Sequence, residues 1–176
     1  MPAQELEDKL KAHIRDVPDF PKPGIVFKDI TTLLRDADAL RLLVEQMALP
    51  FQNQGISQVV GIESRGFILG VPMAYLLGAG FVPVRKPGKL PAHTLRREYA
   101  LEYGTDSLEI HADALKPGQR VLVVDDLLAT GGTAAAALSL LADLEADVVA
   151  AVFAIELGFL KGREKLSCKT TSLIQY

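Results

Sequence analysis

Hydrophobic positions along the chain follow two alternating patterns, and their alternation predicts an α/β fold. Short apolar runs rich in β-branched residues are typical of buried strands, whereas apolar residues three or four positions apart are typical of helices. The predicted strands cover 58–62, 80–84, 107–111, 121–124, 147–155 and 170–175, and the predicted helices cover 4–15, 38–54, 67–77 and an alanine- and leucine-rich run after 133. Pro50 predicts that the second helix kinks or stops near Leu49. Strands alternating with helices indicate a mostly parallel sheet flanked by helices, with ligand bound beyond the carboxyl ends of the strands.

Composition narrows the class of protein. A chain of 176 residues, 49% of them apolar, suits one domain spanning 1–176 with a sizeable core. The formal net charge of −3 gives no general attraction to nucleic acid or to acidic membranes, so we expect neither as a partner. The single cysteine, Cys168, excludes an internal disulfide framework and a cysteine-based zinc site. The N-terminal residues lack the apolar core of a signal peptide and no apolar run could cross a bilayer, so we expect a cytoplasmic protein.

The stretch 120–141 carries the strongest functional pattern. A buried strand is followed by Asp125 and Asp126, then by a small polar loop and the start of a helix. Glycines let a backbone approach a ligand closely, and the first N–H groups of a helix have no intrahelical partner and lie at its positive end. With two threonine hydroxyls, such a turn is suited to a phosphate monoester. The residues of this loop are Ala129, Thr130, Gly131, Gly132 and Thr133.

The two carboxylates would repel that phosphate, so they are suited to sugar hydroxyls or to a Mg²⁺-loaded ligand. The combined pattern predicts a ligand with a phosphate at one end and a diol a few ångströms away, which is the layout of phosphorylated ribose. The structural alternative is a core strand with a polar end and an ordinary glycine turn. The combination of both features in one stretch favours the functional interpretation.

Other phosphate-binding motifs do not fit. The chain has no GxxxxGK[ST] pattern, which disfavours a P-loop nucleotide hydrolase. The run Gly78-Ala79-Gly80 precedes a strand and is followed by Pro83 where a dinucleotide fingerprint needs its third glycine.

Two further segments carry cations close to strand ends. Glu63-Ser64-Arg65-Gly66 joins a strand to a helix, which suits either an anion site or a simple helix cap at Ser64. Arg85, Lys86 and Lys89 follow another strand and form either a solvated basic face or a site for a diphosphate.

Two irregular segments remain open to two interpretations each. Pro21, Pro23 and Gly24 predict an extended loop, and the apolar residues 25–27 are suited to pinning it on the core or to holding a flat ring. The residues alone favour the pinned loop. The long polar connection 91–106 is either a lid or the tip of a two-stranded hairpin.

The run VLVVDDLLATGGT resembles the phosphoribosyl-diphosphate motif of type I phosphoribosyltransferases, and FPKPGIVFKDI and ESRGF resemble segments of the adenine-specific members. The resemblance extends from about 17 to 176. It implies the type I phosphoribosyltransferase fold, with a small hood formed mainly by 17–34 and a flexible catalytic loop. It also implies a homodimer, and Mg²⁺ bound mainly through phosphoribosyl diphosphate rather than by metal ligands of the chain. The implied reaction joins adenine to 5-phospho-α-D-ribose 1-diphosphate and gives AMP and diphosphate, a step of purine salvage.

The resemblance also implies roles for individual residues. Glu102, within a lid, would be the catalytic base. The expected substrate-binding residues are Val26, Phe27 and Lys28 for adenine (Phe27 by stacking, the others largely through the main chain), Arg65, Arg85, Lys86 and Lys89 for diphosphate, Asp125 and Asp126 for the ribose hydroxyls, 129–133 for the 5-phosphate, and Tyr103 in the lid. Many relatives carry Arg where this chain has Lys28, and Lys lacks the planar fork of Arg.

Two alternative functions remain. A transferase for hypoxanthine, guanine or orotate would share the phosphoribosyl pocket and differ in its base. A non-catalytic regulator that keeps this pocket would usually carry a DNA-binding appendage; none is apparent in the sequence, and Glu102 argues for turnover.

Overall fold

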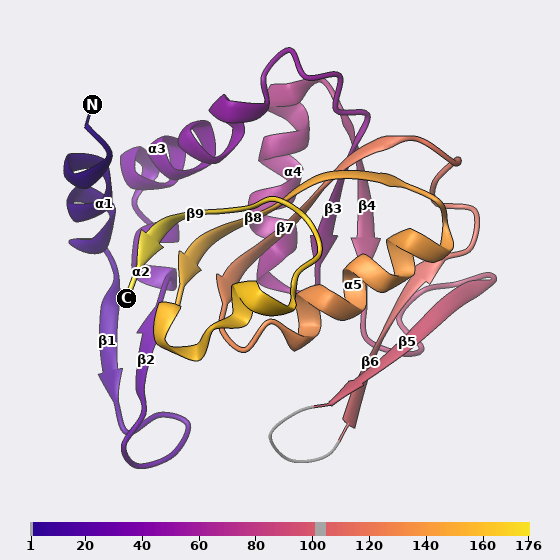
Figure 1. Ribbon diagram of the computed structural model, residues 1–176. Helices are drawn as coiled ribbons and strands as arrows, with labels where there is room; N and C mark the ends of the chain where they lie inside the picture. Colours follow the sequence, from indigo (N-terminus) through magenta and orange to yellow (C-terminus); the bar gives the residue numbers. More distant parts are fainter. Residues whose placement is uncertain (1, 101–104) are drawn as a thin grey trace.

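The computed structural model describes residues 2–100 and 105–176, and its centre is a five-stranded parallel sheet (Figure 1). The strands are β3 (Gln58–Ile62), β4 (Gly80–Val84), β7 (Arg120–Leu128), β8 (Asp147–Glu156) and β9 (Thr170–Gln175), in the spatial order β4-β3-β7-β8-β9. The predicted α/β class is therefore confirmed. From β3 the chain winds to β4 on one side, whereas β7, β8 and β9 follow one another on the other side. Ligands of open α/β sheets bind at such a reversal, beyond the carboxyl ends of the two strands that flank it.

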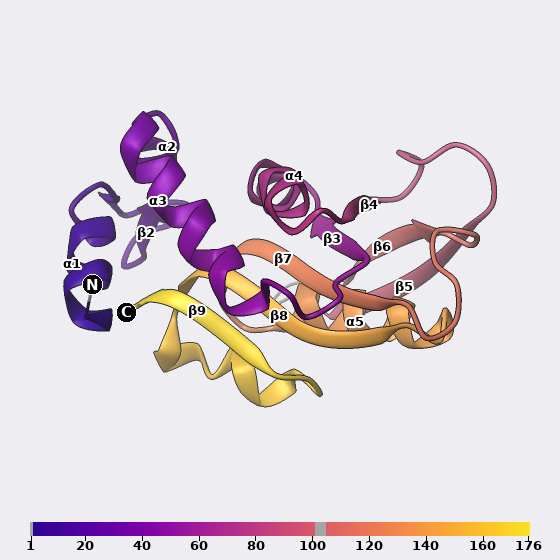
Figure 2. The same ribbon diagram turned by 90° about the horizontal axis from the view of Figure 1, so that it is seen from above.

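Helices cover both faces of this sheet (Figure 2). One face carries α3 (Ala37–Ala48) and α4 (Arg65–Leu77), and the other carries α5 (Gly132–Asp143) together with a hairpin of β5 (Thr94–Ala100) and β6 (Thr105–His111). Successive side chains of a strand point to opposite faces. Accordingly, Leu122 and Val124 pack on the α3–α4 side while Val121 and Val123 pack on the α5 side, and all four are fully buried.

The N-terminal part is more regular than its sequence predicts. The helix α1 (Ala3–Lys11) ends four residues before the predicted limit, because Arg15–Pro18 forms strand β1, which pairs antiparallel with β2 (Val26–Asp29). The segment expected to be an extended loop is thus partly a hairpin. A short helix, α2 (Thr31–Leu34), follows, with its first turn fastened by Asp29, which accepts hydrogen bonds from the backbone N–H and hydroxyl of Thr31 (2.9 and 2.7 Å).

The ends of α3 follow from two side chains. The carboxylate of Asp36 accepts hydrogen bonds from the N–H groups of Asp38 and Ala39 (3.1 and 2.9 Å), so the helix begins slightly before the predicted start. At the other end the chain tightens into the 3₁₀ turn η1 (Leu49–Phe51), which contains Pro50. The predicted stop near Leu49 is confirmed.

Strand β7 differs from its prediction in a way that shapes the site. The sequence predicts a strand of 121–124 that ends in two carboxylates, but β7 continues to Leu128. Its pairing with β3 ends at Val124, whereas its pairing with β8 continues through Asp125 and on to Leu128. Asp125 and Asp126 therefore lie within a strand, along the edge that β3 no longer covers.

The connection from β8 to β9 contains two short 3₁₀ helices, η2 (Gly158–Leu160) and η3 (Gly162–Lys165). The second of these contains Arg163, which is ion-paired with Glu156. The β1–β2 hairpin, which belongs to the predicted hood, lies beyond the carboxyl edge of the sheet near β9. The β5–β6 hairpin lies beyond the same edge at the other end of the strand order (Figure 1). Over the two described ranges, no helix has both the length and the apolar character needed to cross a membrane.

Candidate functional site

A cleft of about 360 Å³ opens at the reversal of strand order. It collects residues from the ends of β3, β4 and β7, from the β5–β6 hairpin and from the loop after β7. Its lining residues are Glu63, Ser64, Arg65, Lys86, Tyr99, Asp125, Asp126, Leu127, Ala129 and Thr133. The fold thus brings together six of the residues that the sequence analysis singled out, although they are spread over nearly seventy positions of the chain.

A smaller pocket of about 80 Å³ adjoins this cleft, and the two share Asp125, Leu127, Ala129 and Thr133. It is enclosed by the chain from Leu127 to Ala134 together with Asp125 and Phe153. We call residues 129–133 the phosphate loop. Helix α5 begins at Gly132 within this loop, so its first N–H groups lie at the pocket and have no intrahelical acceptors. The positive end of the helix dipole also lies here, which suits a compact anion.

The phosphate loop needs glycine for two separate reasons. Gly131 has a φ of +78°, a conformation that residues with a Cβ seldom adopt. In addition, a Cβ at Gly131 would lie 2.3 Å from the carbonyl oxygen of Gly162, and a Cβ at Gly162 would lie 2.1 Å from that of Ala129. The loop therefore packs backbone to backbone on the segment that follows β8.

Arg65 lies at the start of α4 and interacts with the carboxylate pair. Its Nε donates a hydrogen bond to Oδ2 of Asp126, which is buried. In the described structure the side chain of Ser64 makes no capping hydrogen bond to α4. The interpretation of this segment as a simple helix cap therefore lacks the hydrogen bond that it requires. The following Gly66 is required by packing, because a Cβ there would lie 2.6 Å from the carbonyl oxygen of Val124.

The two aspartates have different surroundings. Asp125 is half-buried, and its Oδ1 accepts a hydrogen bond from the N–H of Asp126 (2.9 Å). Burial, followed by the negative charge of Asp126, raises the pKa of Asp125 well above its ordinary value. A cationic ligand beside Asp125 would therefore stabilise its ionised form. In the part of the chain that the structure describes, no group of three or more His, Cys, Asp or Glu side chains could enclose a metal ion.

The basic segment after β4 is divided between the cleft and its rim. Lys86 lines the cleft and donates hydrogen bonds to Tyr99 (3.0 Å) and to Asp106. Burial alone would lower the pKa of Lys86, but these two partners raise it above its ordinary value, so the ammonium stays charged. Arg85 pairs with Glu63 through two nitrogens (3.0 and 3.2 Å), while Lys89 is exposed. The roles of Arg85 and Lys89 as diphosphate ligands stay predictions.

The hood residues lie apart from the cleft lining. Val26 is 50% exposed, and Phe27 is half-buried with its ring edge-on to Phe20, at 5.3 Å between centroids. The ammonium of Lys28 donates to Asp16 (2.7 Å) and lies 4.1 Å from the centre of the Tyr176 ring. This side chain is therefore engaged within the protein. The predicted base contacts stay predictions.

Two of the predicted site residues, Glu102 and Tyr103, lie outside the described residues. The described flanks of that segment are the paired strands β5 and β6, as the hairpin alternative for 91–106 predicts.

Three residues of the site, Glu63, Tyr99 and Asp106, were given no role of their own by the sequence analysis. Glu63 accepts hydrogen bonds from the side chain of Arg85 and the N–H of Lys86 (2.9 Å), and its position directly after a strand was the available signal. Tyr99 and Asp106 meet because they are opposite each other in the β5–β6 register. Nothing in the local sequence indicates that they would meet Lys86.

Comparison with known proteins agrees with this architecture. Residues 32–172 match the family model described as a phosphoribosyl transferase domain. The adenine phosphoribosyltransferase of Acaryochloris marina is 62% identical over 168 residues, which cover 95% of this chain and 99% of that protein. Among solved structures, the enzyme of the same name from Thermoanaerobacter pseudethanolicus has a TM-score of 0.92 at 54% identity, covering 96% and 99% of the two chains. The Saccharomyces cerevisiae enzyme, complexed with an imino-altritol bisphosphate and adenine, has a TM-score of 0.92 at 41% identity, covering 97% and 99%.

Gly131 is constrained by its positive φ and by its contact with Gly162, and a second glycine with a positive φ but no such contact allows the two effects to be separated. Gly131→Ala should lower the free energy of unfolding by about 3 kcal/mol or more, because the positive φ costs about 1–2 kcal/mol and the contact with Gly162 adds to it. Gly78 has a similar φ of +64° with open space around its Cα, so Gly78→Ala should cost only about 1 kcal/mol. Urea unfolding measures both. Equal losses in the two variants would show that the contact with Gly162 has no energetic weight.

Proposed function

Because the chain belongs to the phosphoribosyltransferase family and is 62% identical to an adenine phosphoribosyltransferase, we propose how its site carries out the reaction of that enzyme. The chain transfers the 5-phosphoribosyl group from 5-phospho-α-D-ribose 1-diphosphate to adenine, giving AMP and diphosphate. The observation that carries this function is the 62% identity to an enzyme of that name over nearly its full length. The phosphate loop adjoins the cleft that contains Arg65 and Lys86 at the strand reversal, and these groups can bind the phosphate and diphosphate of the substrate.

The phosphate loop is the anchor for the 5-phosphate of the sugar. The N–H groups at the start of α5 and the hydroxyls of Thr130 and Thr133 are suited to donate to its oxygens. This phosphate takes no part in bond cleavage, so its binding energy is available to hold the ribose C1 in line with the incoming base.

The cleft is the site of the leaving diphosphate. Arg65 and Lys86 line it, and both can stabilise negative charge that develops as the bond from C1 to the diphosphate breaks. Each is paired with a carboxylate of the protein, Arg65 with Asp126 and Lys86 with Asp106, which holds its charge at the cleft wall. The sugar becomes oxocarbenium-like as the diphosphate departs, and the base nitrogen then bonds to C1.

Asp125 and Asp126 are proposed to face the ribose hydroxyls. Asp125 lines both pockets, between the predicted positions of the phosphate and the diphosphate. A carboxylate at this point fits a Mg²⁺ ion that arrives on the diphosphate and keeps much of its own water, since Mg²⁺ is usually bound by one or two carboxylates plus substrate phosphates. When bound, the ion would neutralise charge on the leaving group.

The hood is proposed to hold adenine. Its hairpin, β1–β2, lies beyond the carboxyl edge of the sheet and presents an exposed Val26 and a half-buried Phe27. An aromatic ring is suited to stacking on the base, and main-chain N–H and C=O groups near Val26 and Lys28 are suited to reading its polar edge. A 6-oxo purine presents an inverted polar pattern there and would be disfavoured.

The closest alternative, a transferase for 6-oxo purines or orotate, gives a direct assay. The purified protein with phosphoribosyl diphosphate, Mg²⁺ and each base in turn should form AMP from adenine, with at least about 100-fold lower kcat/KM for hypoxanthine, because mismatched polar groups at the base edge are costly. Removing Mg²⁺ with a chelator should abolish AMP formation. Ligand binding without turnover for any base would favour the non-catalytic regulator instead.

Glu102 is proposed as the general base that takes the proton displaced from adenine. Replacing Glu102 with Gln keeps its size and removes its basicity, so kcat should fall by about 10²–10⁴-fold. Affinity for AMP, measured by calorimetry, should stay within about threefold of the original value, since the loss is confined to the transition state. Unchanged turnover in this variant would remove Glu102 from the mechanism.

We further propose that the protein is a homodimer that uses the outer face of α4. Ile68, Val71 and Tyr75 form an apolar stripe on this helix and are 47%, 51% and 86% exposed. A groove of about 320 Å³ beside them, between α3 and α4, is lined mainly by apolar side chains. Contiguous exposed apolar surface of this kind is typical of protein–protein interfaces.

Val71→Asp should therefore convert the dimer to a monomer, because it buries a charge in the interface. Light scattering coupled to size-exclusion chromatography measures the mass directly. Phe159, 71% exposed in the 3₁₀ turn η2 after β8, provides the matched control, and Phe159→Asp should leave the mass unchanged. A wild-type protein that is monomeric at all concentrations would contradict the proposal.

Two coarser expectations complete the proposal. A single domain over 1–176 is supported by the central sheet, because both hydrophobic clusters pack on its two faces. A cytoplasmic location is supported by the low cysteine content, since Cys168 is the one cysteine of the chain and proteins of oxidising compartments more often carry disulfides. Cell fractionation would check the location, and limited proteolysis would check the domain limits.

A further inference from the structure

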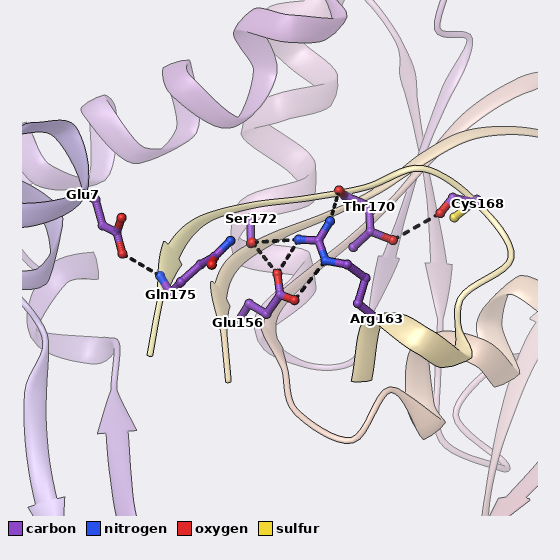
Figure 3. Close-up of polar contacts among 7 residues, drawn as sticks. All are labelled: Glu7, Glu156, Arg163, Cys168, Thr170, Ser172 and Gln175. Atoms are coloured by element: carbon purple, nitrogen blue, oxygen red, sulfur yellow. Dashed lines mark hydrogen bonds and ion pairs between the residues drawn. The ribbon is translucent and has the colours of Figure 1, made fainter. Parts of the chain in front are cut away.

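An ion pair behind the phosphate loop joins the end of β8 to the segment that follows it (Figure 3). The guanidinium of Arg163 donates from Nε to Oε1 of Glu156 (3.0 Å) and from Nη2 to Oε2. Its remaining contacts reach β9, through the carbonyl oxygen of Thr170 (2.6 Å) and the hydroxyl of Ser172 (3.3 Å). Ser172 also donates to Glu156. One side chain thus fastens η3 to two neighbouring strands.

This pair is more than a surface contact. The side chain of Glu156 is 8% exposed, whereas that of Arg163 is 43% exposed. The hydrogen bonds from Arg163 lower the pKa of Glu156 below its ordinary value, so the carboxylate stays ionised despite its burial. Two parallel hydrogen bonds between an arginine and a carboxylate fix the orientation of the guanidinium as well as its distance from the carboxylate.

Both ends of the pair are adjacent to the phosphate loop. Glu156 is paired in register with Leu128, the residue just before the loop, and the N–H of Leu157 donates to the carbonyl oxygen of Leu128 (2.9 Å). Arg163 directly follows Gly162, whose backbone packs against Ala129 and Gly131 so closely that no Cβ fits on either side. The position of Gly162 therefore sets the position of the loop backbone.

We propose that Glu156 and Arg163 are positioning residues for the phosphate loop. By holding Gly162 against Ala129 and Gly131, the pair keeps the loop N–H groups directed at the 5-phosphate without touching the substrate. This inference rests on the proposed function of the loop as the 5-phosphate site. It predicts that breaking the pair weakens recognition of the phosphate and leaves recognition of the base unchanged.

A second ion pair provides a matched control. Arg120 and Asp147 join β7 to β8 at the opposite, amino-terminal edge of the sheet, at 2.9 Å, and Arg120 also donates to the carbonyl oxygen of Gln54 (3.0 Å). This arginine likewise bridges a carboxylate and a backbone carbonyl, but it lies away from the phosphate loop. Its loss can affect stability without affecting the loop.

The experiment compares Arg163→Met, Arg163→Lys, the double variant Glu156→Gln/Arg163→Met and Arg120→Met. Arg163→Met should raise the KM for phosphoribosyl diphosphate and the Kd for ribose 5-phosphate by about tenfold or more, with the KM for adenine within about twofold. Arg163→Lys should recover part of this loss, because Lys keeps the charge but not the fork. Arg120→Met should lower Tm and leave both phosphate parameters unchanged.

The double variant separates positioning from stability. Removing both charges relieves the cost of a buried unpaired carboxylate, so Tm should recover toward the original value. The affinity for ribose 5-phosphate should stay weak, because Gly162 is still unfastened. If affinity instead recovers together with Tm, or if Arg163→Met behaves like Arg120→Met, the pair has only a structural role and the inference is overturned.

A variant of the loop itself distinguishes this inference from its premise. Thr133→Val removes a proposed phosphate donor and should weaken ribose 5-phosphate binding selectively. If Thr133→Val weakens that binding and the Arg163 variants do not, the positioning role fails and the proposed site stands. If none of these variants affects ribose 5-phosphate binding, the proposed phosphate site fails and the positioning role with it.

Discussion

The site depends on the unequal lengths of neighbouring strands. Strand β7 continues beyond the end of β3, and it remains a strand there because β8 is long enough to pair with it on the other side. This leaves one edge of β7 uncovered just where the order of strands reverses. The carboxylates of Asp125 and Asp126 lie on that stretch, and the phosphate loop begins where β7 ends at Leu128. The cleft is thus a consequence of sheet topology before any side chain is considered.

Charge around the cleft is arranged in pairs. Arg65, Arg85 and Lys86 each interact with a carboxylate of the protein, on Asp126, Glu63 and Asp106. Such pairs hold cations in fixed directions within a chain whose net charge is −3. An anionic ligand therefore meets N–H donors held in fixed directions, although each of these cations is balanced by its carboxylate partner. The Glu156–Arg163 pair lies farther from the cleft, and we propose that it holds the backbone at Gly162 rather than a ligand.

Local sequence patterns accounted for much of the architecture. Runs of β-branched residues predicted the parallel strands, and the missing N–H of Pro50 predicted the end of α3, which lies two residues before it. The conformational freedom of glycine predicted the turn at Gly131. The errors arose where long-range pairing overrode local preference. The predicted helix 4–15 ended at Lys11, and Arg15 lies instead in the strand Arg15–Pro18, which pairs with Val26–Asp29. Strand β7 gained four residues at its carboxyl end because β8 was beside it.

The sequence by itself predicted the α/β class and the family, and it led to the proposal of the phosphate loop, because the patterns behind these predictions are local runs of residues. Only the tertiary structure decided that Lys86 meets Tyr99 and Asp106, that Arg65 binds Asp126 and that Gly162 packs on Gly131. Those contacts join residues from different elements, and their formation depends on strand register and on the path of the connections. The spacing of residues along the chain specifies neither the strand register nor the path of the connections. The orientation of the charged side chains in the site is therefore known only from the tertiary structure.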